Sequence, residues 1–183
     1  MAIDFNVMAG GEAGQGVQSV GMILAKTMAN GGLHVFADQD YESRVRGGHN
    51  FFRIRVSDSE VLALSEELDI LIALNKETID FHSNELKSNG VIIYDHEQTK
   101  VDAQGEIFFN VPLGKLAEET VKNKLMTNTV AVGAAAGLAV YDFNILASVL
   151  RKEFARHGER LLRIMLLLPR LGLISHLSMV RRN

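Results

Sequence analysis

Apolar and polar positions along the chain change their spacing several times, and each change marks the limits of an expected element. Short continuous apolar runs predict buried strands, whereas apolar residues three or four positions apart predict amphipathic helices. The expected strands cover residues 3–9, 33–38, 51–58, 61–64, 68–74, 90–94 and 106–111. The expected helices cover residues 15–30, 76–86, 113–124, 127–140 and 143–156. Strands and helices therefore alternate through most of the chain.

The first elements indicate the fold class. A strand, a glycine-rich loop, a helix and a second strand form a βαβ unit, and such crossovers join parallel strands. Residues 51–58 differ, because apolar side chains alternate with Arg53 and Arg55, as in a half-exposed strand. We expect an α/β protein, a three-layer α/β/α Rossmann-like domain with a mixed, mainly parallel sheet, over residues 1–158. The helix at 127–140 is rich in Ala and Gly, and this slender helix is expected deep in the structure or at a subunit contact.

Composition and charge narrow the classes of protein. The 183 residues fit one domain, and 47% hydrophobic with 22% charged residues supports a folded core. A net charge of −3 argues against a dedicated nucleic-acid binder. The absence of cysteine excludes disulfides, thiolate catalysis and Cys-ligated metal clusters within this chain. Neither a signal peptide nor a transmembrane stretch is recognisable, so we expect a cytoplasmic protein without membrane contact.

The first candidate site is the stretch "GGEAGQG", which directly follows the first expected strand. It fits the dinucleotide fingerprint G-x-G-x-x-G only if Ala13 replaces the middle glycine, and Asp38 or Asp40 would be the acidic residue some 20 positions on. A helix amino terminus at this loop would attract an anion. Three interpretations stay open: a tight turn without a ligand, a contact with an anionic group, and an NAD site.

The second candidate site is the stretch "SRVRGGHN", about thirty residues later. Arg44 and Arg46 can grip a phosphate or a carboxylate in a fork, and Gly47 and Gly48 let a partner's backbone approach. The alternative is a surface loop with solvated charges. His49 is expected to form a hydrogen bond within the loop. No metal-ligand spacing and no nucleophile motif occurs in the sequence, so neither catalytic nor metal-binding residues are expected.

The two stretches together, in this order and at this separation, resemble one family. It is the gamma subunit, or gamma domain, of the 2-oxoacid:ferredoxin (acceptor) oxidoreductases. The matching segments are "GEAGQGV", Tyr41-Glu42-Ser43, Arg46-Gly47-Gly48 and "MTNTVAVGAAAG". The resemblance covers residues 3 to about 158. Ala13 is most similar to the version fused in front of the thiamine-binding alpha region, so the chain is expected to correspond to one portion of a longer design.

The resemblance implies a function. Such complexes oxidatively decarboxylate a 2-oxoacid, transfer the acyl group to coenzyme A and pass electrons to ferredoxin. Thiamine diphosphate, magnesium and iron–sulfur clusters are expected on partner alpha and beta subunits, so this chain should be inactive alone. It would pack on the catalytic core and help to receive coenzyme A. The expected ligand-binding residues are Gly11, Ala13, Gly14, Gln15, Gly16, Arg44, Arg46, Gly47 and Gly48.

Other functions and other assembly states stay open beside this one. The chain could be a small NAD(P)-binding oxidoreductase, with its ligand at the glycine loop, or an assembly module that binds no ligand. A homodimer of the isolated chain also stays open.

The last segment, residues 159–183, differs in composition from the rest. It is rich in Leu and Arg, and residues 161–168 form an almost unbroken apolar block around Arg163. One interpretation is a segment that docks on the core or on a partner. The other is a shifted reading frame. Codons that are permitted for residues 159–172, when read in another frame, can encode a polar–apolar helix similar to the family's continuation.

Overall fold

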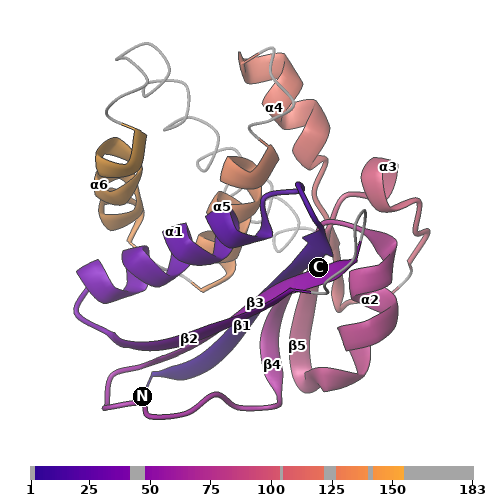
Figure 1. Ribbon diagram of the computed structural model, residues 1–183. Coiled ribbons are helices and arrows are strands. Elements are labelled where there is room, and N and C mark those ends of the chain that lie inside the picture. Colours follow the sequence, from indigo (N-terminus) through magenta and orange to yellow (C-terminus); the bar gives the residue numbers. More distant parts are fainter. Residues whose placement is uncertain (1–2, 42–47, 104, 122–126, 140–141, 155–183) are drawn as a thin grey trace.

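The structure, a computed structural model, describes residues 3–41, 48–103, 105–121, 127–139 and 142–154. A six-stranded sheet carries helices on both faces (Figure 1). Its strands are β1 (Asp4–Glu12), β2 (His34–Tyr41), β3 (His49–Ser57), β4 (Leu68–Ala73), β5 (Leu86–Tyr94) and β6 (Phe108–Asn110). The helices are α1 (Val17–Asn30), α2 (Lys76–His82), the short 3-10 helix η1 (Ser83–Glu85), α3 (His96–Thr99), α4 (Leu113–Val121), α5 (Thr127–Leu138) and α6 (Phe143–Phe154).

The sheet has the order β2-β3-β1-β4-β5-β6. β1, β4, β5 and β6 pair in parallel, whereas β3 is antiparallel to both β1 and β2. The expected α/β class with a mixed, mainly parallel sheet is confirmed. The first βαβ unit differs from the expectation in one respect: β1 and β2 run in the same direction, but β3 lies between them.

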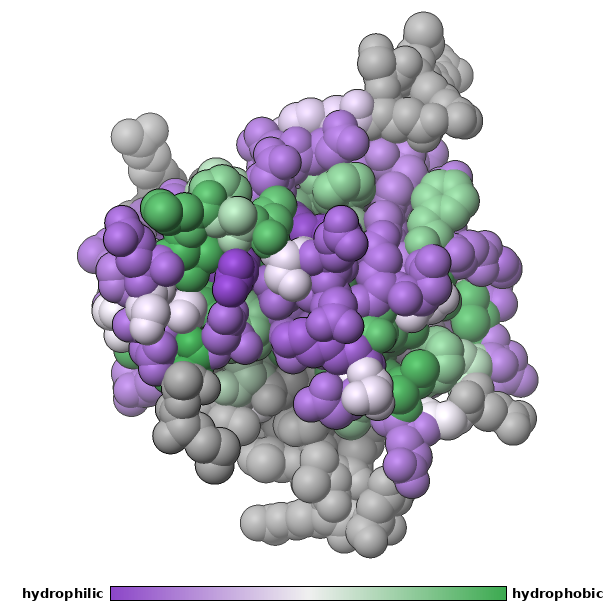
Figure 2. Space-filling view, turned by 90° about the horizontal axis from the view of Figure 1, so that it is seen from below, coloured by the Kyte–Doolittle hydropathy of each residue, from purple (hydrophilic) through white to green (hydrophobic). Residues whose placement is uncertain are grey.

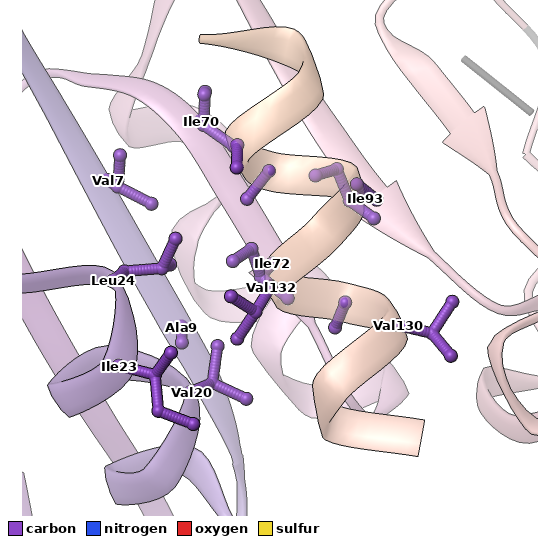
Figure 3. Close-up of a cluster of buried hydrophobic side chains, with 14 of the residues drawn as sticks. Val7, Ala9, Val20, Ile23, Leu24, Ile70, Ile72, Ile93, Val130 and Val132 are labelled. Carbon is purple, nitrogen blue, oxygen red and sulfur yellow. The ribbon is translucent and has the colours of Figure 1, made fainter. Parts of the chain in front are cut away.

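One face of the sheet holds the larger core. Helix α5 lies deep in it, as its slender Ala/Gly sequence predicts, and residues 129–137 are buried. In Figure 3, Val130 and Val132 of α5 lie among sheet residues such as Ile72, and Val20 and Leu24 of α1 lie beside them. Helices α1 and α6 complete this layer (Figure 1).

The opposite face holds a smaller core under α2. Met8, on the other side of β1 from Val7 and Ala9, packs there with Leu71 of β4 and Ile79 of α2. The alternation of side chains along β1 thus divides the two cores. Seen from below, the molecular surface is mostly hydrophilic, with hydrophobic residues in smaller groups (Figure 2).

The strand expected at residues 61–64 is absent, and this prediction is wrong. Residues 58–67 contain no strand or helix, and arginines of β3 bind their carbonyl groups instead. Arg53 donates to the carbonyl oxygens of Ser65 and Glu66, at 3.3 and 3.4 Å. The second face of β3 is therefore covered, and the side chain of Arg53 is only 14% exposed. A guanidinium group has several N–H donors in a fixed geometry. It can therefore donate hydrogen bonds to the carbonyl groups of irregular backbone, as the N–H groups of a partner strand would.

Several limits differ from the sequence prediction. β1 extends to Glu12 and includes Gly10 and Gly11, because β3 pairs with this stretch along its whole length. The short helix α3 was not expected from the sequence, although Asp95 caps it by accepting a hydrogen bond from the Glu97 N–H at 2.9 Å. The proposed boundary at 158/159 and the segment 159–183 lie outside the described residues, so that division stays a prediction.

Candidate functional site

The turn between β1 and α1 depends on glycines in conformations that other residues rarely adopt. Gly14 has a φ of 90°, and Gly16, which precedes the first turn of α1, has a φ of 79°. Glycine reaches positive φ without the steric cost that a Cβ atom brings. Ala13 has no positive φ, so its backbone conformation is open to a residue with a Cβ atom. Gly11 belongs to β1 and not to the turn.

The side chain of Gln15 holds this turn against the sheet. Its Oε1 accepts a hydrogen bond from the Glu12 N–H at 2.6 Å, and its Nε2 donates to the Leu74 carbonyl at 3.2 Å. Its own N–H donates to the Glu12 carbonyl at 3.0 Å. Gln15 therefore fastens the turn to the ends of β1 and β4. Its amide group serves the backbone, which gives this expected ligand-binding residue a structural role.

The amino terminus of α1 is open to a pocket. Within the described residues, the capping position Gly16 gives the helix no side-chain hydrogen bond, and the first turn carries no acidic residue. The first N–H groups of a helix have no partner within the helix and, together with the helix dipole, attract anions. A pocket of about 250 Å³, here named the loop pocket, lies against this turn. Its lining residues are Glu12, Gly14, Gly16, Val17, Gln18, Ser19, Gln39, Tyr41, Asn50, Phe51 and Phe52.

The loop pocket lies between the two stretches that the sequence singled out. In the sheet register, His49 pairs with Glu12 and Asn50 pairs with Gly11. Gly48, with a φ of 105°, directly precedes this pairing. The antiparallel β3 thus brings the end of the second stretch beside the glycine turn. Arg44, Arg46 and Gly47 lie outside the described residues, so their role in a site stays a prediction.

The charge of the pocket is modest in the described part of the chain. Of the described residues that line it, Glu12 is the only charged one. A carboxylate here repels an anion, whereas the amino terminus of α1 attracts one. Gln18, Ser19, Tyr41 and Asn50 provide neutral hydrogen-bonding groups. Sequence reasoning did not count these four among the ligand-binding residues, although Tyr41 and Asn50 belong to segments that it singled out and Gln18 and Ser19 directly follow the glycine loop.

Helix α5 also reaches the glycine turn. A Cβ atom on Gly16 would lie 1.9 Å from Nδ2 of Asn128, so the amide of Asn128 packs directly on the glycine. Asn128 stands in the first turn of α5. The starts of α1 and α5 therefore meet at Gly16. Sequence reasoning did not bring the two together, because nothing in the spacing of Asn128 relates it to a residue 112 positions earlier.

The geometry disfavours a dinucleotide site. In that fold the acidic residue that binds the ribose ends the strand next to the first one. Here β3 separates β1 from β2, which carries Asp38 and Asp40. Two strand spacings of about 4.8 Å each therefore lie between β1 and β2. Each carboxylate also accepts a hydrogen bond from the next backbone N–H, at 2.8 Å.

A second, larger cavity of about 530 Å³ lies at the carboxyl end of β5. It is lined by Asp95, Glu97, Gln98, Gly114, Lys115, Glu118, Glu119 and Thr127. Asp95, 3% exposed, accepts hydrogen bonds from the N–H of Gly114 and from Nε2 of Gln98, both at 2.9 Å. These bonds join the start of α4 to the end of β5, which is a structural role. The sequence did not point to this cavity.

The ionisation equilibria of Asp4, Arg55 and Tyr94 are shifted, and these residues do not line the loop pocket. A hydrogen bond from Arg55 lowers the pKa of Asp4, and the same bond raises the pKa of Arg55. Burial raises the pKa of Tyr94. Within the described ranges, no three His, Asp or Glu side chains are grouped so as to hold a metal ion. The helices of the described part of the chain are all too short or too polar to cross a membrane.

Comparison with known proteins identifies the family. Residues 6–167 match the family model described as pyruvate ferredoxin/flavodoxin oxidoreductase. Since this match covers most of the chain, the chain belongs to that family. The alpha subunit of 2-oxoacid:ferredoxin oxidoreductase 2 from Aeropyrum pernix is 26% identical over 182 residues, covering 97% of this chain and 28% of that subunit.

Solved structures show the same fold. The 2-oxoglutarate:ferredoxin oxidoreductase from Magnetococcus marinus aligns with a TM-score of 0.87 and 24% identity, over 96% of this chain and 31% of that chain. The keto/oxoacid ferredoxin oxidoreductase gamma subunit from Geobacter sulfurreducens aligns with a TM-score of 0.78 and 23% identity, over 95% and 99%. The chain thus spans less than a third of the longer relatives and matches the fold of a separate gamma subunit throughout. The expected membership of this oxidoreductase family is confirmed by the family model.

Proposed function

We propose that this chain is a non-catalytic component of a thiamine-diphosphate-dependent 2-oxoacid:ferredoxin oxidoreductase in the cytoplasm. In this proposal it packs on alpha and beta subunits that carry the thiamine cofactor, magnesium and the iron–sulfur clusters. Family membership supports the proposal. The complex would convert a 2-oxoacid to an acyl-coenzyme A and pass the electrons to ferredoxin.

The residues of this chain do not fit the redox and thiamine cofactors. The sequence has no cysteine to bind an iron–sulfur cluster. It also lacks the Gly-Asp-Gly…Asn pattern that holds a metal and a diphosphate in thiamine enzymes. The described residues offer no metal-binding cluster either. The chemistry of the reaction is therefore assigned to the partner chains.

The loop pocket does fit an anionic group. The observation that carries this part of the proposal is the uncapped amino terminus of α1, which opens into a pocket of about 250 Å³. That volume suits a phosphate or diphosphate and lies below the 300–1,000 Å³, roughly, of sites that enclose a whole ligand. We assign to the backbone N–H groups after Gly16 the binding of one phosphate portion of coenzyme A. The rest of the coenzyme would lie outside the pocket, against a partner chain.

The 2-oxoglutarate:ferredoxin oxidoreductase from Magnetococcus marinus supports this choice of ligand, because its structure holds bound coenzyme A and succinyl-CoA. Coenzyme A also meets the chemical requirement, since its phosphates are anions. The dinucleotide alternative has less support, because β3 separates β1 from the strand that carries Asp38 and Asp40.

The variant Gln18→Glu tests the anion site in the reconstituted complex. Gln18 is exposed in the first turn of α1 and lines the loop pocket. A carboxylate there favours the helix dipole by about 0.3–1 kcal/mol, so the fold should be slightly stabilised. The same charge repels a phosphate, and we expect the KM for coenzyme A to rise about tenfold, which corresponds to about 1.4 kcal/mol.

The matched control is Met22→Glu, which adds the same charge one turn further along α1. Met22 is 38% exposed and does not line the loop pocket. Its KM for coenzyme A should stay at the wild-type value. If Gln18→Glu also leaves that KM unchanged while the complex assembles, the chain acts as an assembly module. Binding of NAD(P)H to the isolated chain would instead favour the dinucleotide alternative.

A further inference from the structure

The two edges of the sheet differ in how much backbone they offer to a further strand. β6 forms one edge with 3 residues, and β2 forms the other with 8. An edge strand presents a row of N–H and C=O groups with which another chain can pair, and a very short edge strand limits this pairing. Every residue of β2 is exposed except Val35, which is half-buried. β2 is therefore the edge at which the sheet is open to an added strand.

Hydrogen bonds at the ends of β1 show which way its backbone groups point. In a strand, the N–H and C=O groups of one residue point to the same side, and successive residues alternate. The Gly10 carbonyl accepts a hydrogen bond from the Leu74 N–H, directly after β4, at 3.0 Å. The Ile3 carbonyl accepts one from the Asp58 N–H, directly after β3, also at 3.0 Å. Even-numbered residues of β1 therefore point to β4, and odd-numbered residues point to β3.

The register carries this alternation across the sheet to β2. Odd-numbered residues of β1 pair with even-numbered residues of β3, as Val7 does with Ile54. The odd-numbered residues of β3 consequently point to β2, where they pair with even-numbered residues, as Arg53 does with Asp38. The remaining backbone groups of β2 point away from the sheet. They belong to Val35, Ala37, Gln39 and Tyr41.

Side chains of the same strand bind two of these four outward N–H groups. Oδ1 of Asp38 accepts a hydrogen bond from the Gln39 N–H at 2.8 Å. Oδ1 of Asp40 accepts one from the Tyr41 N–H, also at 2.8 Å. An added strand would need both N–H groups as donors to its own carbonyl oxygens. It would have to break two hydrogen bonds to carboxylates, which are stronger than those between neutral groups.

We propose that Asp38 and Asp40 protect the β2 edge against pairing with another strand, because they hold the N–H groups that such a strand requires. The outward residues that stay open, Val35 and Ala37, span only three positions, the length of β6. Both edges of the sheet are then short. This role accounts for two aspartates that the geometry disfavours as ribose ligands, and it does not depend on coenzyme A or on partner chains.

Amide hydrogen exchange of the full chain, followed by nuclear magnetic resonance, tests the two hydrogen bonds directly. After correction for intrinsic rates, the N–H groups of Gln39 and Tyr41 should exchange at least about tenfold more slowly than that of Ala37, because a bonded amide exchanges only after its bond opens. Ala37 also points outward, but it follows Phe36, whose side chain has no acceptor. Exchange of Gln39 and Tyr41 at the rate of Ala37 would overturn the proposal.

Two double variants separate the bound N–H groups from the negative charge. Asp38→Ala/Asp40→Ala removes both, whereas Asp38→Asn/Asp40→Asn removes the charge and keeps an oxygen that can accept from the same N–H groups. In sedimentation at matched concentrations, the alanine variant should self-associate about tenfold more tightly than the wild type, because its open edge can pair with a second copy. The asparagine variant should stay at the wild-type value. Wild-type behaviour of the alanine variant, or equal association of the two variants, would contradict the proposal.

Adding Ala37→Pro to the alanine variant locates the new contact. Proline has no N–H group, and it is tolerated on an edge strand where that group would face solvent. The added proline should return self-association to the wild-type value, and unchanged association would place the contact elsewhere and refute the proposal. Positions 37, 38 and 40 are exposed, so circular dichroism should show an unchanged fold. If a variant does not fold, hydrogen exchange of the wild type still decides.

Discussion

Replacing Gly16 by alanine should destabilise the fold more than replacing Gly14, although both glycines have positive φ. At Gly14, with a φ of 90°, an added Cβ atom meets nothing within 4 Å. At Gly16, with a φ of 79°, it would lie 1.9 Å from Nδ2 of Asn128. The first change therefore tests the backbone conformation alone. The second tests the conformation together with the contact between α1 and α5.

The magnitudes follow from these two causes. A left-handed conformation costs a non-glycine residue about 1–2 kcal/mol, and the lower entropy of the unfolded alanine chain offsets about 0.4–1 kcal/mol of this cost. Gly14→Ala should therefore lower the free energy of unfolding by about 1 kcal/mol. Overpacking adds about 1–3 kcal/mol, so Gly16→Ala should lower it by about 2–4 kcal/mol. For a chain of this length, 1 kcal/mol changes the Tm by roughly 2–4 °C.

Urea unfolding followed by circular dichroism measures both variants. Asn128→Ala removes the obstructing amide. In the Asn128→Ala background, Gly16→Ala should therefore lower the free energy of unfolding by only about 1 kcal/mol, as expected for Gly14→Ala. The two sites are then coupled in the sense of a double-mutant cycle. Equal destabilisation by Gly14→Ala and Gly16→Ala, or no relief from Asn128→Ala, would refute the reasoning that Asn128 packs on Gly16.

Three further predictions concern activity, the last segment and pH. The purified chain with a 2-oxoacid, coenzyme A, thiamine diphosphate and magnesium should not reduce a viologen dye; reduction without partner chains would contradict the assigned role. Deleting residues 159–183 should leave the Tm nearly unchanged and reduce aggregation if they come from a shifted frame, whereas a large fall in Tm would show that they dock natively. Arg55 lowers the pKa of Asp4 below 3.8, so their contact stabilises the fold above that pH and loses its effect as the pH falls through the lowered value. The stability difference between wild type and Arg55→Gln should therefore shrink on acidification below pH 4, and a constant difference would count against this linkage.

The local sequence pattern was sufficient to predict those elements whose burial or backbone conformation follows from their own residues. The run at Leu68–Ala73 is apolar except for Asp69, and β4 is largely buried on both faces, as such a run predicts. Small residues in α5 predicted its deep position, because a helix without large side chains lets other backbones approach. The glycines at 14 and 16 also pointed to the turn, since few other residues adopt its backbone conformation.

Pairing between distant segments could not be predicted in the same way. The alternation in β3 shows that it has two different faces, but it does not say which strands lie at its edges. Gly10 and Gly11 disfavour a strand by their propensity, yet β3 and β4 flank β1 where Gly10 stands, and that pairing outweighs the propensity. Arg53 looked solvent-exposed for the same reason, because its partner Glu85 is 32 residues away.

The insertion of β3 between β1 and β2 has the largest consequence for function. It places the start of β3 directly beside the glycine turn, so that one pocket joins α1, β2 and β3. It also moves the acidic residues of β2 away from that turn, which removes the ribose-binding arrangement of a dinucleotide fold. Under the proposed function, this antiparallel strand makes a loop that resembles a nucleotide fingerprint better suited to one phosphate group.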